Sequence, residues 1–165
     1  KAIRKEDSKK VIIKEARPNT GFDGQRRTAL ERLNIEYDAL CKLKDIEGIV
    51  NTVEKFQAWE HHFIVEEYIE GNTLHSWIAK NFPFLTYEKA DEYKKKGYRI
   101  IKKLICIVEN MHEKSIVMGD LQPNNIIIGE NEEVHLIDFE TASSVTEDPL
   151  VGLAVPTFSN VDIKS

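Results

Sequence analysis

Two acids and an amide surround a pair of short apolar runs in the stretch MGDLQPNNIIIGENEEVHLIDFE. Asp120 is followed five positions later by Asn125. Residues 126–128 and 134–137 have β-type composition and are separated by turn residues, so they predict a hairpin that ends at Asp138. The three polar side chains are therefore expected to face one cleft.

This arrangement of polar groups is suited to phosphoryl transfer, in which a protein positions an alcohol, a triphosphate and Mg²⁺. Asp120 is expected to accept the proton of the hydroxyl. Asn125 and Asp138 offer the hard oxygen ligands that Mg²⁺ prefers. The alternative is a hairpin with ordinary surface acids, because Asp and Asn are also common turn residues.

Composition limits the class of protein. The chain has 165 residues, of which 41% are apolar and 31% charged. These values are expected for a globular domain with one core. A net charge of -5 argues against nucleic acid as the main ligand. Because the sequence has no apolar run long enough to span a bilayer, and its charged start lacks a signal-peptide core, we expect a cytoplasmic protein without a membrane partner.

The two cysteines, Cys41 and Cys106, lie in segments with helical patterns. Neither belongs to a C-x-x-C pair or a Cys/His cluster. We expect both to be buried thiols rather than metal ligands or nucleophiles.

The start of the chain, residues 1–14, predicts a β-hairpin with a polar turn. The two-residue period of a strand places Ile12 and Lys14 on one face, and Val11 and Ile13 on the other. A lysine on such an apolar strand ordinarily faces water.

Apolar side chains in residues 25–43 have helical spacing, and Asp23 or Gly24 is expected to start this helix. Residues 49–56 and 62–65 predict two further strands, which complete a small sheet covered by the helix. The apolar stripe of the helix consists of Leu30, Leu33, Tyr37, Leu40 and Cys41.

Two more helices are expected, at residues 73–80, capped by Asn72, and within residues 87–113. The longer one is predicted to bury Ile101, Leu104, Ile105, Val108 and Met111. It also carries the basic run Lys94, Lys95, Lys96, Arg99, Lys102 and Lys103. We interpret this run as a solvated face, with binding of an acidic peptide as the alternative.

The sequence DLQPNN followed by IDF resembles the catalytic loop and metal-binding motif of protein kinases. That resemblance implies an α+β, two-lobed fold and aims Lys14 at the α- and β-phosphates of a nucleotide. It also implies a glutamate partner for Lys14 in the following helix. Glu36 matches that position best, and Glu31 and Asp38 are the alternatives.

The sequence EEYIEGNTL resembles the hinge between the two kinase lobes. In that resemblance the Glu67 carbonyl and the Ile69 amide bind the purine edge of ATP, GTP or another nucleoside triphosphate. Glu66 then takes the gatekeeper position, which is usually uncharged. Because a buried unpaired carboxylate is costly, Glu66 is expected to pair inside the pocket or to turn outward.

Several residues depart from the pattern of regulated protein kinases. Gly119 replaces the arginine that pairs with a phosphorylated activation loop, which argues against control of that kind. Gln122 replaces a lysine directed at the transferred phosphoryl group, and Ile12 replaces a small residue that touches adenine. Glu140 replaces the glycine after Phe139, where it would either approach Mg²⁺ or point to solvent.

The sequences VIIKEARP, EHHFIVEEYIEG and DFE together resemble the kinase domain of class III lanthipeptide synthetases. Those enzymes join a lyase, a kinase and a cyclase-like domain in one chain. The resemblance implies phosphorylation of Ser and Thr in a precursor peptide, followed by phosphate elimination and thioether ring formation elsewhere in the enzyme.

In this interpretation residues 1–68 form the N-lobe, and residues 69–165 form the start of the C-lobe with the catalytic loop, DFE and part of the activation segment. No Gly-rich phosphate-covering loop precedes Lys14, and the chain stops soon after Phe158, where a kinase would continue into further helices. We therefore expect a kinase fold that is incomplete at both ends. Two other functions remain open. One is a small-molecule phosphotransferase of the antibiotic type, which also has Gly before the catalytic Asp, and the other is a pseudokinase binding module.

Overall fold

The computed structural model describes residues 1–18, 22–24, 26–84 and 87–144. Its first part is an antiparallel sheet with strand order β1-β2-β4-β3. The strands are β1 (Ala2–Ile3), β2 (Lys10–Ala16), β3 (Thr52–Ala58) and β4 (His61–Glu67). The initial hairpin and the two further strands are thus present as predicted, with β3 displaced toward the end of the chain.

Helix α1 (Ala29–Leu43) begins at a capping box and not at Asp23 or the glycine after it. Thr28 Oγ1 accepts a hydrogen bond from the Glu31 amide at 3.2 Å, and the Glu31 carboxylate accepts one from the Thr28 amide at 2.6 Å. Asp23 instead binds the backbone and the guanidinium of Arg27 before the helix. The helical period in residues 25–43 could not distinguish among these starting points.

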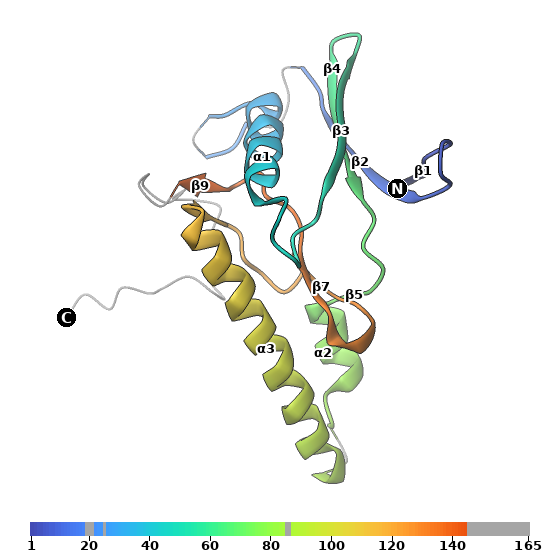
Figure 1. The fold of residues 1–165 in the computed structure, drawn as a ribbon, viewed down its shortest axis with the longest axis vertical. Helices are drawn as coiled ribbons and strands as arrows, with labels where there is room; N and C mark the ends of the chain where they lie inside the picture. The colour runs from blue at the N-terminus through green and yellow to red at the C-terminus, as the bar shows by residue number, and fades with distance from the viewer. Residues whose placement is uncertain (19–21, 25, 85–86, 145–165) are drawn as a thin grey trace, which may run out of the picture.

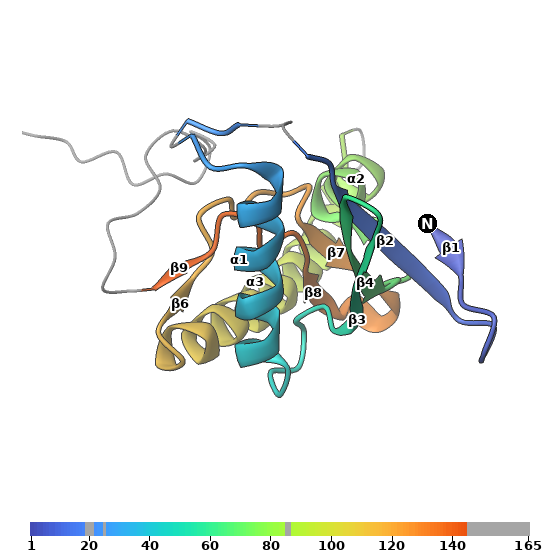
Figure 2. The same cartoon turned by 90° about the horizontal axis from the view of Figure 1, so that it is seen from above.

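The helix packs beside the sheet, as Figure 2 shows from above. Leu33 of α1 contacts Ala16 of β2 and Ile64 of β4 in a small apolar cluster. The buried face of α1 also contains Glu36, whose side chain is only 2% exposed. Cys41 was predicted to lie on the apolar stripe as a buried thiol, but it is exposed, so this prediction was wrong.

The second part of the chain contains α2 (Leu74–Asn81), a 3-10 turn (Tyr87–Lys89) and α3 (Ala90–Glu113). Thr73 caps α2, accepting from the Ser76 amide at 3.2 Å, so the expected Asn72 cap was wrong. Figure 1 shows α2 and the long α3 at the end of the molecule away from the β3–β4 hairpin.

Short strands connect these two parts. The sheet β5-β7-β8 consists of β5 (Asn72–Thr73), β7 (Ile126–Ile128) and β8 (Val134–Leu136), and a 3-10 turn (Glu130–Glu132) joins its last two strands. Separately, β6 (Ile116–Val117) pairs with β9 (Ser143–Ser144). The predicted hairpin at residues 126–137 is therefore confirmed, although its second strand already ends at Leu136.

The main core lies between α3, the end of α1 and the strands β7 and β8. Helix α3 buries Ile100, Ile107 and Met111, whereas the expected core residues Ile101 and Ile105 are 56% and 52% exposed. Both sides of α3 carry apolar residues, and packing against β7 and β8 determines which side is buried. The same selection leaves Cys106 exposed, so the expectation of a buried thiol was wrong there too.

Several side chains of the basic run bind residues of this chain. Arg99 forms two hydrogen bonds with Glu132, at 2.5 and 2.6 Å, and Lys103 donates to the Glu132 carbonyl at 2.8 Å. Lys96 pairs with Glu92 at 2.7 Å. The contacts with Glu132 fasten α3 to the turn between β7 and β8. Within the described residues, no helix is both long and apolar enough to cross a membrane.

The loop after α1 joins the two parts through backbone hydrogen bonds. The Leu136 amide donates to the Gly48 carbonyl at 2.8 Å, and the Val50 amide donates to the Leu136 carbonyl at 3.1 Å. Gly48 has φ +90, and a Cβ placed there would lie 2.4 Å from Ile107 Cδ1. The close approach of α3 and β8 therefore requires glycine at this position.

Gly48→Ala is expected to destabilise the fold by about 1 to 3 kcal/mol, because it combines an unfavourable φ with overpacking. The matched control is Gly97→Ala in α3, where an added Cβ meets no atom within 4 Å. That change is expected to stabilise the helix by about 0.5 to 1 kcal/mol. Urea denaturation of the full-length protein measures both, and a shift of the same sign in the two variants would contradict the assignment.

Candidate active site

The side chain of Lys14 lies at the centre of a cluster of carboxylates. Its Nζ is 2.5 Å from Glu36 Oε1, 3.2 Å from Asp138 Oδ1 and 3.5 Å from Glu66 Oε1. Lys14 comes from β2, Glu36 from α1 and Glu66 from β4. The period-two pattern of β2 turns Lys14 toward α1, together with Ile12, which lies directly opposite Glu66 in the sheet.

Glu36 binds a second group as well. The backbone amide of Phe139 donates to Glu36 Oε1 at 2.7 Å, and the Phe139 side chain is fully buried. Asp138, the residue before it, has φ +70. This left-handed conformation costs an L-residue about 1 to 2 kcal/mol. One buried carboxylate thus fixes both Lys14 and the segment that carries Asp138, and neither Glu31, which caps the helix, nor Asp38 takes this place.

The charges in this cluster alter one another's ionisation. Burial acts to lower the pKa of Lys14, but the three surrounding carboxylates outweigh it, so this pKa is raised. Burial also raises the pKa of Glu36, and it raises the pKa of Glu66 to about 7. Glu36 has two close donors, whereas Glu66 Oε1 is buried without a hydrogen-bond partner in the described structure. We infer that a proton on this cluster resides on Glu66.

The loop after β6 holds Asp120 through side-chain amides. Asp120 Oδ2 accepts from Gln122 Nε2 at 2.8 Å and from Asn125 Nδ2 at 3.0 Å, and Asn125 Nδ2 also donates to the Asp120 carbonyl. Asp120 Oδ1 is buried and has no hydrogen-bond partner among the described residues. The carboxylate is therefore oriented on one side and unpaired on the other. Gln122, a departure from the kinase pattern, takes part in this orientation.

Asn125 is also tied to the strand that leads to Asp138. The Ile137 amide donates to the Asn125 carbonyl at 3.0 Å, so the two predicted metal ligands lie on neighbouring segments. Because Asn125 Nδ2 faces Asp120, its Oδ1 is the side-chain atom left to accept a cation. Mg²⁺ is commonly held by one or two such oxygen ligands with substrate phosphates and water. Asn125 and Asp138 fit that donor set and would hold the ion, which would neutralise charge on the phosphates.

The predicted hinge begins with the last two residues of β4, Glu66 and Glu67. The Glu67 amide donates to the Asn51 carbonyl at 3.0 Å, and the Glu67 carboxylate accepts from Asn51 at 2.9 Å. Ile69 is partly buried against the main core. These contacts fix the chain at the hinge, and the role of the Glu67 carbonyl and the Ile69 amide in binding a purine stays a prediction. Glu66 pairs inside the molecule, which is one of its two expected outcomes.

Sequence reasoning missed one ion pair next to the site. Arg32 Nε donates to Glu140 Oε2 at 3.2 Å, and the Glu140 side chain is 45% exposed. Whether Glu140 approaches Mg²⁺ or only solvent stays a prediction. Arg32 precedes Glu36 by four residues, which places both on one face of α1. This spacing was the only sign in the sequence that Arg32 lies near the site. It could not identify Glu140 as the partner, because Glu140 is 108 positions away in the chain.

The glycine before Asp120 has a structural reason. A Cβ at Gly119 would lie 2.7 Å from the Thr141 carbonyl oxygen and 3.1 Å from Thr141 Oγ1. Pairing of β6 with β9 brings Thr141 this close. A larger residue at position 119, such as arginine, would require the segment after Phe139 to move.

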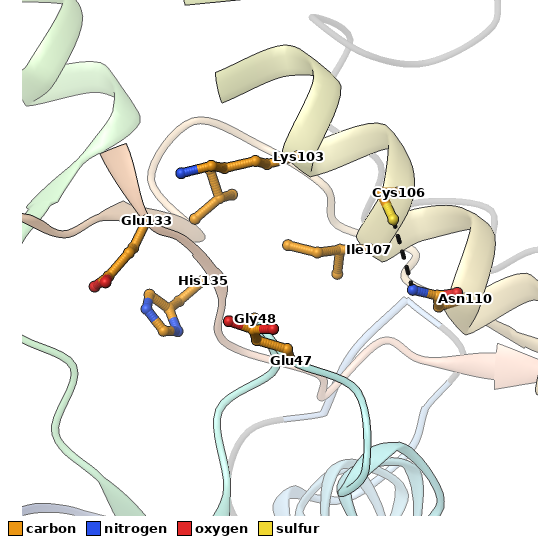
Figure 3. Close-up of a pocket in the computed structure, with 9 residues that line it drawn as sticks. Glu47, Gly48, Lys103, Cys106, Ile107, Asn110, Glu133 and His135 are labelled. Atoms are coloured by element: carbon orange, nitrogen blue, oxygen red, sulfur yellow. Dashed lines mark hydrogen bonds between the residues drawn. The ribbon is translucent and has the colours of Figure 1, made fainter. Parts of the chain in front are cut away.

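A pocket of about 490 Å³ lies apart from these residues (Figure 3). It is bordered by the loop after α1, by α3 and by β8, with Ile107 and Val134 among its lining residues. Cys106 is on its rim, where Asn110 Nδ2 donates to the thiol sulfur at 3.8 Å. None of the predicted site residues lines this pocket.

Protonation of Glu66 gives a testable pH dependence of stability. The folded protein keeps this proton between pH 4.5 and about 7, whereas the unfolded chain releases it near pH 4.5. The unfolding free energy therefore falls as pH rises through this window, by on the order of 3 kcal/mol. Glu66→Gln removes this contribution, so its stability relative to wild type is expected to increase across the same window. Urea denaturation at several pH values measures the difference, and parallel curves would refute the assignment.

Comparisons with known proteins agree with this geometry. The family model described as "Protein kinase domain" matches residues 1–158. The probable SapB synthase of Streptomyces coelicolor is 29% identical over 153 residues, which are 90% of this chain and 16% of that protein.

Two relatives are named serine/threonine kinases. The probable serine/threonine-protein kinase KIN1 homolog of Enterocytozoon bieneusi is 30% identical over 74% of this chain and 20% of its own length. The probable serine/threonine-protein kinase PknB of Lactococcus lactis is 28% identical over 85% of this chain and 20% of its own length. The chain thus spans a fifth or less of these relatives. Since the family model matches nearly the whole chain, and the α+β fold brings Lys14, Glu36 and Asp138 together, this chain belongs to the protein kinase family.

Proposed function

We propose that the protein containing this chain transfers the γ-phosphoryl group of ATP, GTP or another nucleoside triphosphate to Ser and Thr hydroxyls of a lanthipeptide precursor. The observation that carries the proposal is the meeting of Lys14 from β2, Glu36 from α1 and Asp138 from the segment after β8. Both carboxylates lie within 3.2 Å of one ammonium group. The Lys14 ammonium is thus suited to bind phosphate oxygens next to Asp138, a predicted metal ligand.

Each residue has a role in this proposal. Asp120 accepts the proton of the substrate hydroxyl, and its unpaired Oδ1 supports that role. Asn125 and Asp138 hold Mg²⁺. Lys14, positioned by Glu36, binds the phosphates, while the Glu67 carbonyl and the Ile69 amide bind the base. Residues 1–68 act as the N-lobe and residues 69–165 as the start of the C-lobe.

The choice of a precursor peptide rests on two kinds of support. The sequences VIIKEARP and DFE resemble class III lanthipeptide synthetases, and a relative that matches over most of this chain is named a synthase. Gly119 also leaves no arginine to read a phosphorylated activation loop, as expected for a biosynthetic kinase rather than a signalling one. In this proposal, lyase and cyclase-like domains of the same protein process the phosphorylated peptide.

Asp120→Asn in the full-length protein is expected to lower phosphate transfer by at least about 100-fold, because an amide cannot accept the hydroxyl proton. Nucleotide binding should be retained, because the side-chain oxygen of an asparagine can still accept from Gln122 and Asn125, the groups that Asp120 binds in the described structure. The matched control is Asp91→Asn, an exposed acid in α3 that should leave the rate unchanged. Radiolabelled phosphate transfer and nucleotide titration measure the two properties. Retained transfer in the Asp120 variant would exclude this residue as the base.

Substrate choice distinguishes peptide modification from the antibiotic-type alternative, which Gly119 also fits. The full-length protein is expected to phosphorylate Ser/Thr-containing precursor peptide and to leave aminoglycosides unmodified. Mass spectrometry detects the added phosphate in both cases. Phosphorylation of aminoglycosides but not of the peptide would favour the antibiotic-type phosphotransferase. Mg²⁺-dependent nucleotide binding with no product from either substrate would favour a pseudokinase.

A further inference from the structure

Helix α1 contacts the segment after β8 at two successive positions. Glu36 accepts from the Phe139 amide at 2.7 Å, and Arg32, one helical turn earlier, binds Glu140 at 3.2 Å. Glu36 is nearly fully buried, whereas the Arg32 and Glu140 side chains are 17% and 45% exposed. The inner contact is a buried polar bond, and the outer one is a partly exposed ion pair.

We propose that Arg32 and Glu140 form a positioning pair that holds the segment 138–140 against α1 and so keeps Asp138 beside Lys14. This inference rests on the proposed function. Neither residue touches the reacting atoms. Their effect passes through the Phe139–Glu36 hydrogen bond, which lies between the ion pair and the Lys14 ammonium.

The backbone at Asp138 explains why an additional contact is useful there. Asp138 adopts φ +70, which is unfavourable for any residue with a Cβ, and it persists only where neighbouring contacts fix it. Phe139 fixes the chain directly after Asp138 through its buried ring. The ion pair at Glu140 adds a second restraint on the same side of Asp138, one residue after Phe139. A glycine at position 140 would lack this contact and would also be freer to change conformation.

The size of the effect follows from solvent exposure. An ion pair of this kind is screened by water, and exposed pairs alter an equilibrium by about two- to fivefold. Arg32 also donates to the Arg27 carbonyl at 3.4 Å, so a single change at Arg32 removes more than the pair. A double-mutant cycle isolates the coupling between the two side chains.

The test uses Arg32→Gln, Glu140→Gln and the double variant in the full-length protein. The first readout is hydrogen–deuterium exchange of the Phe139 amide, which does not depend on activity. Each single variant is expected to exchange about two to five times faster than wild type, and the double variant no faster than the faster single one. Exchange in peptides from α3 around Met111 should not change, whereas general destabilisation would accelerate both regions.

The second readout is phosphate transfer to the precursor peptide, in which kcat should fall by a similar factor and with the same non-additivity. Arg32→Lys should restore part of the loss, because it keeps the charge. The matched control is the cycle of Arg99→Gln and Glu132→Gln, an ion pair between α3 and the turn of the β7–β8 hairpin, which should leave Phe139 exchange unchanged.

Additive effects of the two changes, or unchanged Phe139 exchange in Glu140→Gln, would overturn the positioning pair. Coupled exchange without coupled kcat would also overturn it, because the pair would then be structural only. Absence of phosphate transfer by the wild-type protein is a different result, since it would reject the proposed function while the exchange cycle still measures the contact.

Discussion

The carboxylate of Glu36 is the contact on which the site depends. It is buried in α1, and it joins a lysine from the sheet to a backbone amide beyond β8. A buried charge is tolerated only when it is paired and hydrogen-bonded, so both partners are needed to keep it there. The backbone bonds between Gly48, Val50 and Leu136 make the arrangement possible, because they fix the end of α1 relative to β8.

The charge balance around Lys14 is unusual. One ammonium group faces three carboxylates, and Glu66, in the position expected to be uncharged, is one of them. Burial raises the pKa of Glu66 to about 7, and a proton on this carboxyl would reduce the repulsion between these groups. The proposed reaction brings more negative charge as phosphate, and the positive charge of Mg²⁺ at Asn125 and Asp138 would offset it.

Three departures from regulated kinases have local physical reasons in this fold. Gly119 admits the Thr141 carbonyl, Gln122 orients Asp120, and Glu140 binds Arg32. In each case the residue makes a contact within or beside the site. Gly119 and Glu140 contact the segment after Phe139 or its neighbours, whereas Gln122 acts on the catalytic loop.

The local pattern of the sequence determined the elements and the candidate residues. Strand period placed Lys14 on one face with Ile12, and the hairpin at residues 126–137 placed Asn125 and Asp138 at its two ends, because these depend on neighbours in the chain. The resemblance to protein kinases singled out Glu36 among the acids of its helix. Only the tertiary structure decided which apolar side of α3 is buried, why Gly119 must be small, and that Arg32 meets Glu140. Each of these is set by a segment far away in sequence, and α3 shows the reason most clearly: Ile101 and Ile107 are equally apolar, and contact with β7 and β8 alone distinguishes them.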